Sequence, residues 1–227
     1  MPKRTKATKK TDEGKAWNRK PKPSAYQINT IPINKTILIV CEGQTEKLYF
    51  ESFPVLGAKV EVIDLKGQSK LKLVELTDNI IENSEFEYDV IWCVFDMDVK
   101  RGEKEFADFD NSINKAIQSD YKVAYSNDAF ELWFYLHYNY TETQNHRNYY
   151  YDELSKRWSI NYVKDGKKRN FSLKIYQQLL NDPNNQVQAI SRAKKLYENH
   201  KHLAYHKQNP VTMVYELVQE LNENLRR

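Results

Sequence analysis

The pattern that most constrains the fold of this chain is an alternation of short apolar runs with helical segments between residues 36 and 137. The apolar runs predict strands at 36–41, 59–65, 89–95 and 121–126. The segments between and after them predict helices at 45–53, 69–83, 103–119 and 128–137. Strands separated by helices of this length form βαβ units with right-handed crossovers. The sequence therefore predicts an α/β fold with a mostly parallel sheet flanked by helices.

Two of the apolar runs carry almost no polar residue. Residues 37–40 read ILIV, and residues 90–95 read VIWCVF. Continuous apolar strands are typical of the centre of a parallel sheet, because helices cover both of its faces there. We therefore expect these two runs to be central strands of one core domain that extends over residues 31–137.

The character of the chain changes at residue 138, where Tyr and Asn become frequent and strand signals become weak. Helices are predicted at 186–199 and 211–225, the second of them directly after an Asn-Pro step. An Asp-Gly step at 165–166, between Tyr162 and Phe171, predicts a β-hairpin. We interpret residues 138–227 as a mostly helical elaboration packed on the core domain.

The N-terminal part of the chain carries most of its positive charge. The first 22 residues contain nine Lys or Arg and two acids, a net charge of +7, and the whole chain carries +4, so the remainder carries −3. Residues 1–30 show no periodicity and are predicted to be a disordered basic tail. Such a tail either binds phosphate backbones without sequence preference or only keeps the protein in solution.

Apolar patterning and cysteine usage predict the compartment. No apolar run reaches the roughly 18–20 residues of a membrane span, and no apolar segment follows the basic N-terminus as in a secretory signal. Cys41 and Cys93 both lie in apolar runs, which indicates two buried, reduced thiols. We therefore expect a cytoplasmic protein with no membrane partner.

Acidic residues stand at the carboxyl ends of two predicted strands. Glu42 follows the first, and Asp96 and Asp98 end the third, spaced to point to one side of an extended backbone. Ligands of open parallel sheets bind beyond these ends, and carboxylates gathered there need a cation to offset their repulsion. Oxygen ligands suit Mg²⁺ or Mn²⁺. The pattern thus predicts a divalent metal site, which suits activation of a water against a phosphodiester.

Each of these motifs also has a simpler interpretation. An Asp-x-Asp after a strand is often a solvated loop or a helix cap, and a Glu-Gly is often only a turn. Glu46 lies one helical step after Glu42 and either meets the positive end of the helix dipole or reaches the metal. Lys100 and Arg101 either hold a substrate phosphate or are solvated loop charges.

Longer stretches of the chain resemble known families. The segments ILIVCEGQTEKLYF (37–50) and VFDMDVKRG (94–102) resemble the Toprim domain, a catalytic fold with a Glu and an Asp-x-Asp that topoisomerases, bacterial primases and overcoming-lysogenization-defect nucleases share. The segments VAYSNDAFELWFYLHY (123–138) and NPVTMVYELVQEL (209–221) resemble, more narrowly, the RloB-like family, a Toprim branch of bacterial defence islands. The resemblance spans residues 35 to 221.

The most specific part of the resemblance is one block after the fourth predicted strand, formed by Ser126, Asn127, Phe130, Glu131 and Trp133. The family usually has Asn-Pro-Cys where this chain has Asn-Asp-Ala at 127–129, so the chain carries one additional acid near the expected site.

The resemblance implies metal-dependent cleavage of nucleic acid, RNA such as tRNA or DNA, during defence against phage. By position, Glu42 resembles the general acid/base, Asp96 and Asp98 resemble the metal-binding pair, and Glu131 matches the family's fourth acid. The expected metal ligands are Glu42, Glu46, Asp96, Asp98 and Glu131. Lys100, Arg101 and Asn127 are the expected substrate-binding residues. The family context also implies a companion ATPase.

Several alternatives stay open at this point. The Tyr-rich run at 138–151, which includes neighbouring cations, suits either stacking on unpaired bases or half-buried packing. A haloacid-dehalogenase phosphatase also begins with a strand and an Asp-x-Asp, but Lys100 stands where that class needs Thr or Val. A non-catalytic nucleic-acid-binding or sensor subunit is the third possibility. No glycine-rich phosphate cradle is present, so the chain is not itself predicted to be an ATPase.

Overall fold

The computed structural model describes residues 35–66, 69–97, 103–166, 168–181 and 183–225. The predicted basic tail lies outside these ranges, as do three of the predicted site residues, Asp98, Lys100 and Arg101. By packing, residues Pro32–Arg227 form one unit, which contains all of the described elements.

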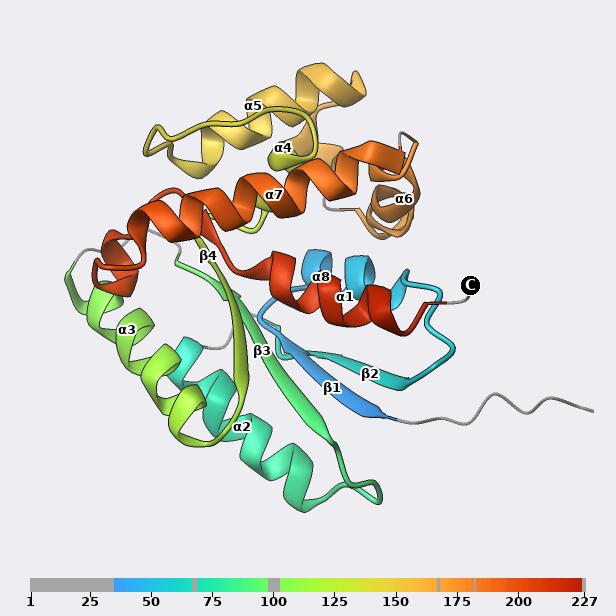
Figure 1. Ribbon diagram of the computed structural model, residues 1–227, viewed down its shortest axis with the longest axis vertical. Helices are drawn as coiled ribbons and strands as arrows, with labels where there is room; N and C mark the ends of the chain where they lie inside the picture. The colour runs from blue at the N-terminus through green and yellow to red at the C-terminus, as the bar shows by residue number, and fades with distance from the viewer. Residues whose placement is uncertain (1–34, 67–68, 98–102, 167, 182, 226–227) are drawn as a thin grey trace, which may run out of the picture. The chain divides into compact units, whose positions relative to one another are not determined.

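A five-stranded sheet with the order β2-β1-β3-β4-β5 forms the centre of this unit (Figure 1). Its strands are β1 (Thr36–Cys41), β2 (Lys59–Asp64), β3 (Val90–Asp96), β4 (Lys122–Asn127) and β5 (Val211–Thr212). The first four are mutually parallel, and β5 pairs antiparallel with β4. The predicted α/β fold and its four parallel strands are confirmed.

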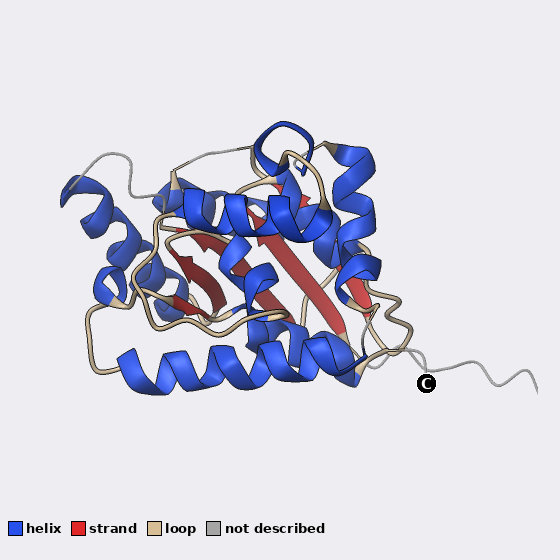
Figure 2. Ribbon diagram, turned by 90° about the horizontal axis from the view of Figure 1, so that it is seen from above, coloured by secondary structure: helices blue, strands red, loops and turns tan. Residues whose placement is uncertain are grey.

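Helices cover both faces of the sheet, as Figures 1 and 2 show. The crossover helices are α1 (Gln44–Glu51), α2 (Lys70–Glu82) and α3 (Glu103–Gln118). The helices α2 and α3 lie together on one face, and α1 lies on the other face together with the later helix α8 (Val214–Glu223). The direction of the strand order therefore reverses between β1 and β3. This reversal is the topological switch point, where open α/β sheets bind their ligands.

The apolar strand residues form the core, as their sequence pattern predicts. Residues 37–40 of β1 are fully buried, and Trp92 and Phe95 of β3 are 1% exposed. Each fully buried aliphatic side chain contributes roughly 1.5–3 kcal/mol to stability. The short helix α4 (Glu131–Leu136) is buried along its whole length and packs edge-on against α1 through Phe134 and Tyr49. It thereby fixes the position of its first residue, Glu131.

The chain after α4 is mostly helical, as predicted, although two of its local structures differ from expectation. It contains α5 (Arg147–Trp158), the π-helical turn η3 (Tyr162–Gly166), α6 (Arg169–Leu179), α7 (Pro183–His200), the short 3₁₀ helix η4 (Tyr205–Lys207) and α8. The predicted helix at 211–225 begins only at Val214, because residues 211–212 form the edge strand β5.

The predicted hairpin around Asp165-Gly166 is wrong. The segment turns in a single π-helical turn, because the fully buried Tyr162 ring packs directly on Gly166. A Cβ at residue 166 would lie 2.2 Å from that ring, so only glycine fits. Phe171, the expected second strand residue, belongs instead to α6, which buries Ile175 and Leu179 at helical spacing.

Two further expectations concern the thiols and the membrane. Cys41 and Cys93 are both buried and free, as predicted. Among the described residues, no helix has the length and apolar character that crossing a membrane requires.

Candidate active site

The ends of β1 and β3 place two predicted acids side by side at the switch point. Glu42 follows β1 directly, and its backbone N–H donates to the Val94 carbonyl of β3 at 3.0 Å. Asp96 is the last residue of β3. Because β1 and β3 are hydrogen-bonded neighbours, the two acids lie on adjacent strand ends, an adjacency that the sequence pattern had left open.

A pocket of about 570 Å³ opens at this edge of the sheet. Four predicted acids line it: Glu42 after β1, Glu46 in the first turn of α1, Asp96 at the end of β3 and Glu131 at the start of α4. Asp64, at the end of β2, lines it as well. Three neighbouring parallel strands thus each deliver a carboxylate to one pocket.

Glu46 is one of the two buried acids of the pocket, together with Glu131, which is 3% exposed. The side chain of Glu46 is 8% exposed, and Gly43 packs so closely over it that a Cβ there would lie 2.8 Å from Glu46 Oε2. Burial, together with the charges of Asp96, Glu131 and Glu42, raises the pKa of Glu46 to about 8. The carboxylates of this pocket therefore lie so close together, and Glu46 so deep, that ionisation of Glu46 is disfavoured.

Basic side chains partly offset this charge. Lys70, which opens α2 after the Ser69 N-cap, places Nζ 3.7 Å from Glu42 Oε1. Arg147, which opens α5, places its guanidinium 3.7 Å from Asp96 Oδ2. The side chains of Lys70 and Arg147 are each 9% exposed, so both ion pairs lie where solvent screening is weak.

Asp128, the acid that departs from the family pattern, anchors this arginine. Asp128 is fully buried, and its Oδ1 lies 3.5 Å from the Arg147 guanidinium. The backbone N–H of Arg147 donates to Asp128 Oδ2 at 2.8 Å, and the guanidinium donates to the Asp128 carbonyl at 3.2 Å. The extra acid thus positions Arg147 at the pocket.

Glu131 is oriented from the helical C-terminal region. The Tyr162 hydroxyl donates to Glu131 Oε1 at 3.1 Å, in a fully buried contact. Burial and the Glu131 charge together raise the pKa of Tyr162 well above its ordinary value, so this hydroxyl remains a donor at neutral pH. The backbone N–H of Phe130, which precedes Glu131, lies 3.4 Å from Asp96 Oδ2.

The chemistry of this donor set suits a hard divalent cation. Every acidic ligand that the pocket offers is a carboxylate oxygen, which matches Mg²⁺ or Mn²⁺. Within the described part of the chain, however, no three His, Cys, Asp or Glu side chains are grouped closely enough to hold a metal together. Glu42 and Asp96 are oriented toward Lys70 and Arg147 instead.

The sequence prediction and the structure overlap in part. Glu42, Glu46, Asp96 and Glu131 lie together, whereas Asn127 lines a neighbouring cavity. The predicted residues Asp98, Lys100 and Arg101 lie outside the described residues. Among the charged residues that line the pocket, Asp64, Lys66 and Arg147 escaped prediction, and so did Lys70, which pairs with Glu42 from outside the lining.

The signals for the missed residues differ. Asp64 ends an apolar strand, which is the same signal that identified Glu42 and Asp96. Lys66 and Lys70 stand close behind the same strand, where the sequence offers no specific signal. Arg147 reaches the pocket from a helix that begins 51 residues after Asp96, and only the tertiary fold brings the two together.

The Tyr-rich run contributes mainly to packing. Tyr150 is fully buried, Tyr151 is 6% exposed, and Tyr149 is 38% exposed. Tyr135 contacts the rings of both Tyr149 and Tyr150 at centroid distances of 5.6–5.7 Å. For Tyr150 and Tyr151, burial favours the packing interpretation over base stacking.

Comparison with known proteins identifies the family. No curated protein and no solved structure matched the chain. The family model described as "RloB-like protein" matches residues 37–221, which include the pocket and its supporting helices. This match covers most of the chain, so the protein belongs to the RloB-like family.

Proposed function

We propose that the protein is a metal-dependent nuclease that hydrolyses phosphodiester bonds of RNA, such as tRNA, or of DNA. The observation that carries this proposal is the gathering of carboxylates from three parallel strand ends and two helices in one pocket at the switch point. Membership of the RloB-like family and the resemblance of its Glu and Asp-x-Asp motifs to the Toprim domain support it.

The acids of this pocket would hold Mg²⁺ or Mn²⁺. Asp96 lies at the end of the central strand β3, and Glu42, Glu46 and Glu131 line the same pocket. Asp98, two residues after Asp96, is the further ligand expected from the sequence. When bound, the cation neutralises charge on the scissile phosphate and lowers the pKa of a coordinated water.

Proton transfer and phosphate binding are the roles of side chains at the pocket. Glu42 accepts and returns a proton as general acid/base, and the Lys70 ammonium lies 3.7 Å from its carboxylate. Arg147 and Lys66 present cationic groups at the pocket, where they bind phosphate oxygens of the substrate strand. Tyr162 holds Glu131 in place through its hydroxyl.

Defence against phage, with a companion ATPase as regulator, is part of the same proposal and rests on the family alone. A non-catalytic nucleic-acid-binding or sensor role is the second candidate. The ion pairs of Glu42 with Lys70 and of Asp96 with Arg147 favour it, because they already offset these acids without a metal.

Cleavage of bulk tRNA and of plasmid DNA, each in Mg²⁺, Mn²⁺ or EDTA, tests the proposal. We expect cleavage in the presence of either metal, none in EDTA, and none by Asp96→Asn. Asp152→Asn, the same change at an exposed position of α5, is the matched control and should cut at the wild-type rate. Cleavage by Asp96→Asn at the wild-type rate contradicts this mechanism.

The binding role makes a different prediction for a second variant. If the pocket only binds nucleic acid, Glu42→Gln should abolish binding of the strand. If the pocket is catalytic, the same variant should lose cleavage and still bind. Filter binding of labelled tRNA in Ca²⁺, beside the cleavage assay, separates the two roles.

A further inference from the structure

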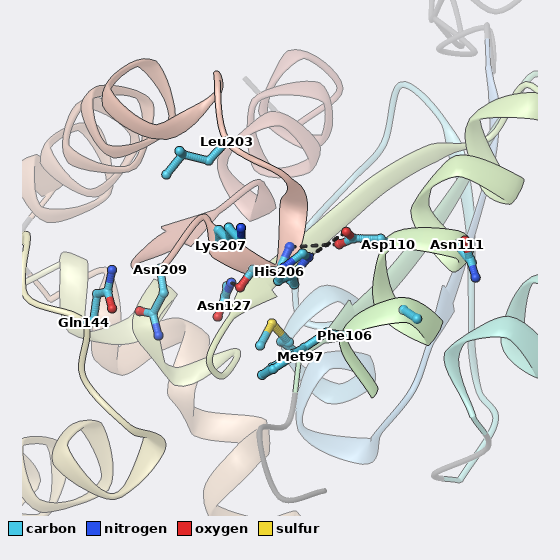
Figure 3. A pocket seen from close by; sticks show the side chains of 11 residues that line it. Met97, Phe106, Asp110, Asn111, Asn127, Gln144, Leu203, His206, Lys207 and Asn209 are labelled. Carbon is cyan, nitrogen blue, oxygen red and sulfur yellow. Dashed lines mark hydrogen bonds and ion pairs between the residues drawn. The ribbon is translucent and has the colours of Figure 1, made fainter. Parts of the chain in front are cut away.

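A second cavity, of about 990 Å³, lies beside the active-site pocket (Figure 3). Met97, which follows β3, and Asn127, which ends β4, form part of its wall. The segment around η4 adds Leu203, His206 and Asn209 to the wall. Its volume is within the range of small-molecule sites.

Asn127 holds an unpaired hydrogen-bond acceptor in the wall of this cavity. Its Nδ2 donates to the backbone carbonyls of Tyr205 at 3.3 Å and His206 at 3.1 Å. Because both amide hydrogens are used in this way, the orientation of the carboxamide is fixed, and Oδ1 points away from that backbone. Figure 3 shows Oδ1 directed between Asn209 and Met97. Asn127 is fully buried, and its Oδ1 has no hydrogen-bond partner among the described residues.

Asn209 adds a second acceptor of the same kind. Its Oδ1 is buried and also lacks a hydrogen-bond partner within the described ranges. Buried polar atoms without partners cost free energy, and native proteins rarely keep them without a reason. Two such oxygens in the wall of one cavity suit a ligand that displaces the atoms covering them and brings N–H donors to both.

An aromatic platform borders the same cavity. The rings of Phe106 and His206 are stacked with a centroid distance of 5.4 Å and an angle of 22°. The Asp110 carboxylate holds His206 in place through two contacts. The backbone N–H of His206 donates to Asp110 Oδ1 at 2.8 Å, and Nδ1 of His206 lies 2.7 Å from Asp110 Oδ2. Met97, which is 3% exposed, belongs to the apolar wall behind the two rings. A flat ligand with apolar faces and polar edges fits this combination.

The cavity shares a strand end with the active-site pocket. Asp96 lines the pocket, and the next residue, Met97, lines the cavity. Side chains of consecutive residues in an extended chain point to opposite sides, so a single strand separates the two spaces. A ligand in the cavity therefore lies next to the carboxylates.

We propose that this cavity binds a nucleobase with an exposed amino group, taken from an unpaired nucleotide of the substrate strand beside the cleaved bond. Guanine, adenine and cytosine carry amino donors that Asn127 and Asn209 can accept, whereas uracil presents only one ring N–H between two carbonyls. The aromatic platform supplies the stacking surface that unpaired bases use. The assignment of the base to a substrate strand rests on the proposed nuclease function.

Calorimetric titration with GMP, AMP, CMP and UMP, in EDTA, tests base binding without any cleavage. We expect at least one amino-bearing nucleotide to bind at least tenfold more tightly than UMP. Asn209→Leu and Phe106→Ala should each weaken that binding about tenfold or more. Asn199→Leu, an exposed position on α7, is the matched control and should bind as the wild type does. Asn127→Leu is a poorer test, because its amide also holds the backbone at 205–206.

A second titration uses single strands of about ten nucleotides with one abasic position moved along the strand. A tenfold loss at one position supports a base of the strand as the ligand. Tight binding of a mononucleotide with no effect of any abasic position assigns the cavity to a free nucleotide and overturns the substrate-strand assignment.

The proposal is overturned if no mononucleotide binds, if UMP binds as tightly as the others, or if Asn209→Leu and Phe106→Ala both bind as the wild type does. These outcomes are independent of the nuclease test. A protein that binds bases but cuts no strand contradicts the proposed nuclease function and supports the base-binding cavity. A protein that cuts a strand but binds no base supports the nuclease function and contradicts the base-binding cavity.

Discussion

Replacement of Glu46 by Gln should make the protein more stable, and increasingly so as the pH rises. In the folded protein the pKa of Glu46 is about 8, against an ordinary value of 4.5. Between these two values the unfolded chain has lost the proton and the folded chain keeps it. The free energy of unfolding of the wild type therefore falls by about 1.4 kcal/mol per pH unit in this window, through this group alone.

The size of the effect follows from the same two pKa values. They are about 3.5 pH units apart, so the ionised Glu46 costs roughly 5 kcal/mol at pH 8 and above. Gln resembles the protonated acid and carries no such cost. The two proteins should be about equally stable near pH 4, and Glu46→Gln should be more stable by roughly 5 kcal/mol at pH 8.5.

Urea unfolding at several pH values between 4 and 9 measures this difference, with fluorescence of the buried Trp92 and Trp133 as the signal. Glu51→Gln is the matched control, because Glu51 lies on the same helix but its side chain is 39% exposed. That variant should stay within about 0.5 kcal/mol of the wild type at every pH. A difference between Glu46→Gln and wild type that does not change with pH refutes the reasoning.

Addition of Mg²⁺ extends the same experiment to the metal. A cation bound beside Glu46 favours its ionised form, so the stability advantage of Glu46→Gln at pH 8.5 should shrink. An advantage that stays the same at saturating Mg²⁺ would exclude a cation at this carboxylate.

Three further predictions concern neighbouring residues. Asp128→Ala should lower the free energy of unfolding by about 3–5 kcal/mol, because it removes the buried carboxylate beside the Arg147 guanidinium. Asp128→Asn should lower the free energy of unfolding by less. Urea unfolding at pH 7 measures both variants. Burial lowers the pKa of His137 to about 4, so the wild type should lose up to about 3 kcal/mol as the pH falls from 6.5 to 4, and His137→Phe should not show this loss in the same assay. Tyr162→Phe should destabilise the protein by about 1–2 kcal/mol in thermal unfolding, because Glu131 loses a buried donor; an unchanged midpoint would argue against that hydrogen bond.

The sheet could be predicted from the sequence because the signals that mark its parallel strands are local. Each parallel strand is a short run of apolar residues, and an acid at the end of such a run lies at the carboxyl edge whatever the rest of the chain does. That rule placed Glu42 and Asp96 at the carboxyl edge, and the structure adds that their strands are adjacent. The same rule would also have found Asp64 if it had been applied to the second strand.

The remainder of the site depends on contacts between distant segments. Arg147 meets Asp96 only because Asp128 holds the first residue of α5 in place. The Asp-Gly step at 165–166 carries a genuine turn signal, but the burial of Tyr162 decides which turn forms, and no local pattern records that burial. Asn127 ends a predicted strand, yet the sequence does not show that its side chain belongs to a second cavity.

The adjacency of Asp96 and Met97 in the chain gives the two cavities a route for thermodynamic linkage. Any displacement of the tip of β3 by a ligand in one cavity changes the shape of the other. If a base in the cavity tightens cation binding by some factor, the cation must tighten base binding by the same factor, because the coupling free energy belongs to the pair. A base that fits the cavity would then strengthen metal binding at the carboxylates. The protein would thus distinguish nucleotides by how tightly it binds the metal in their presence.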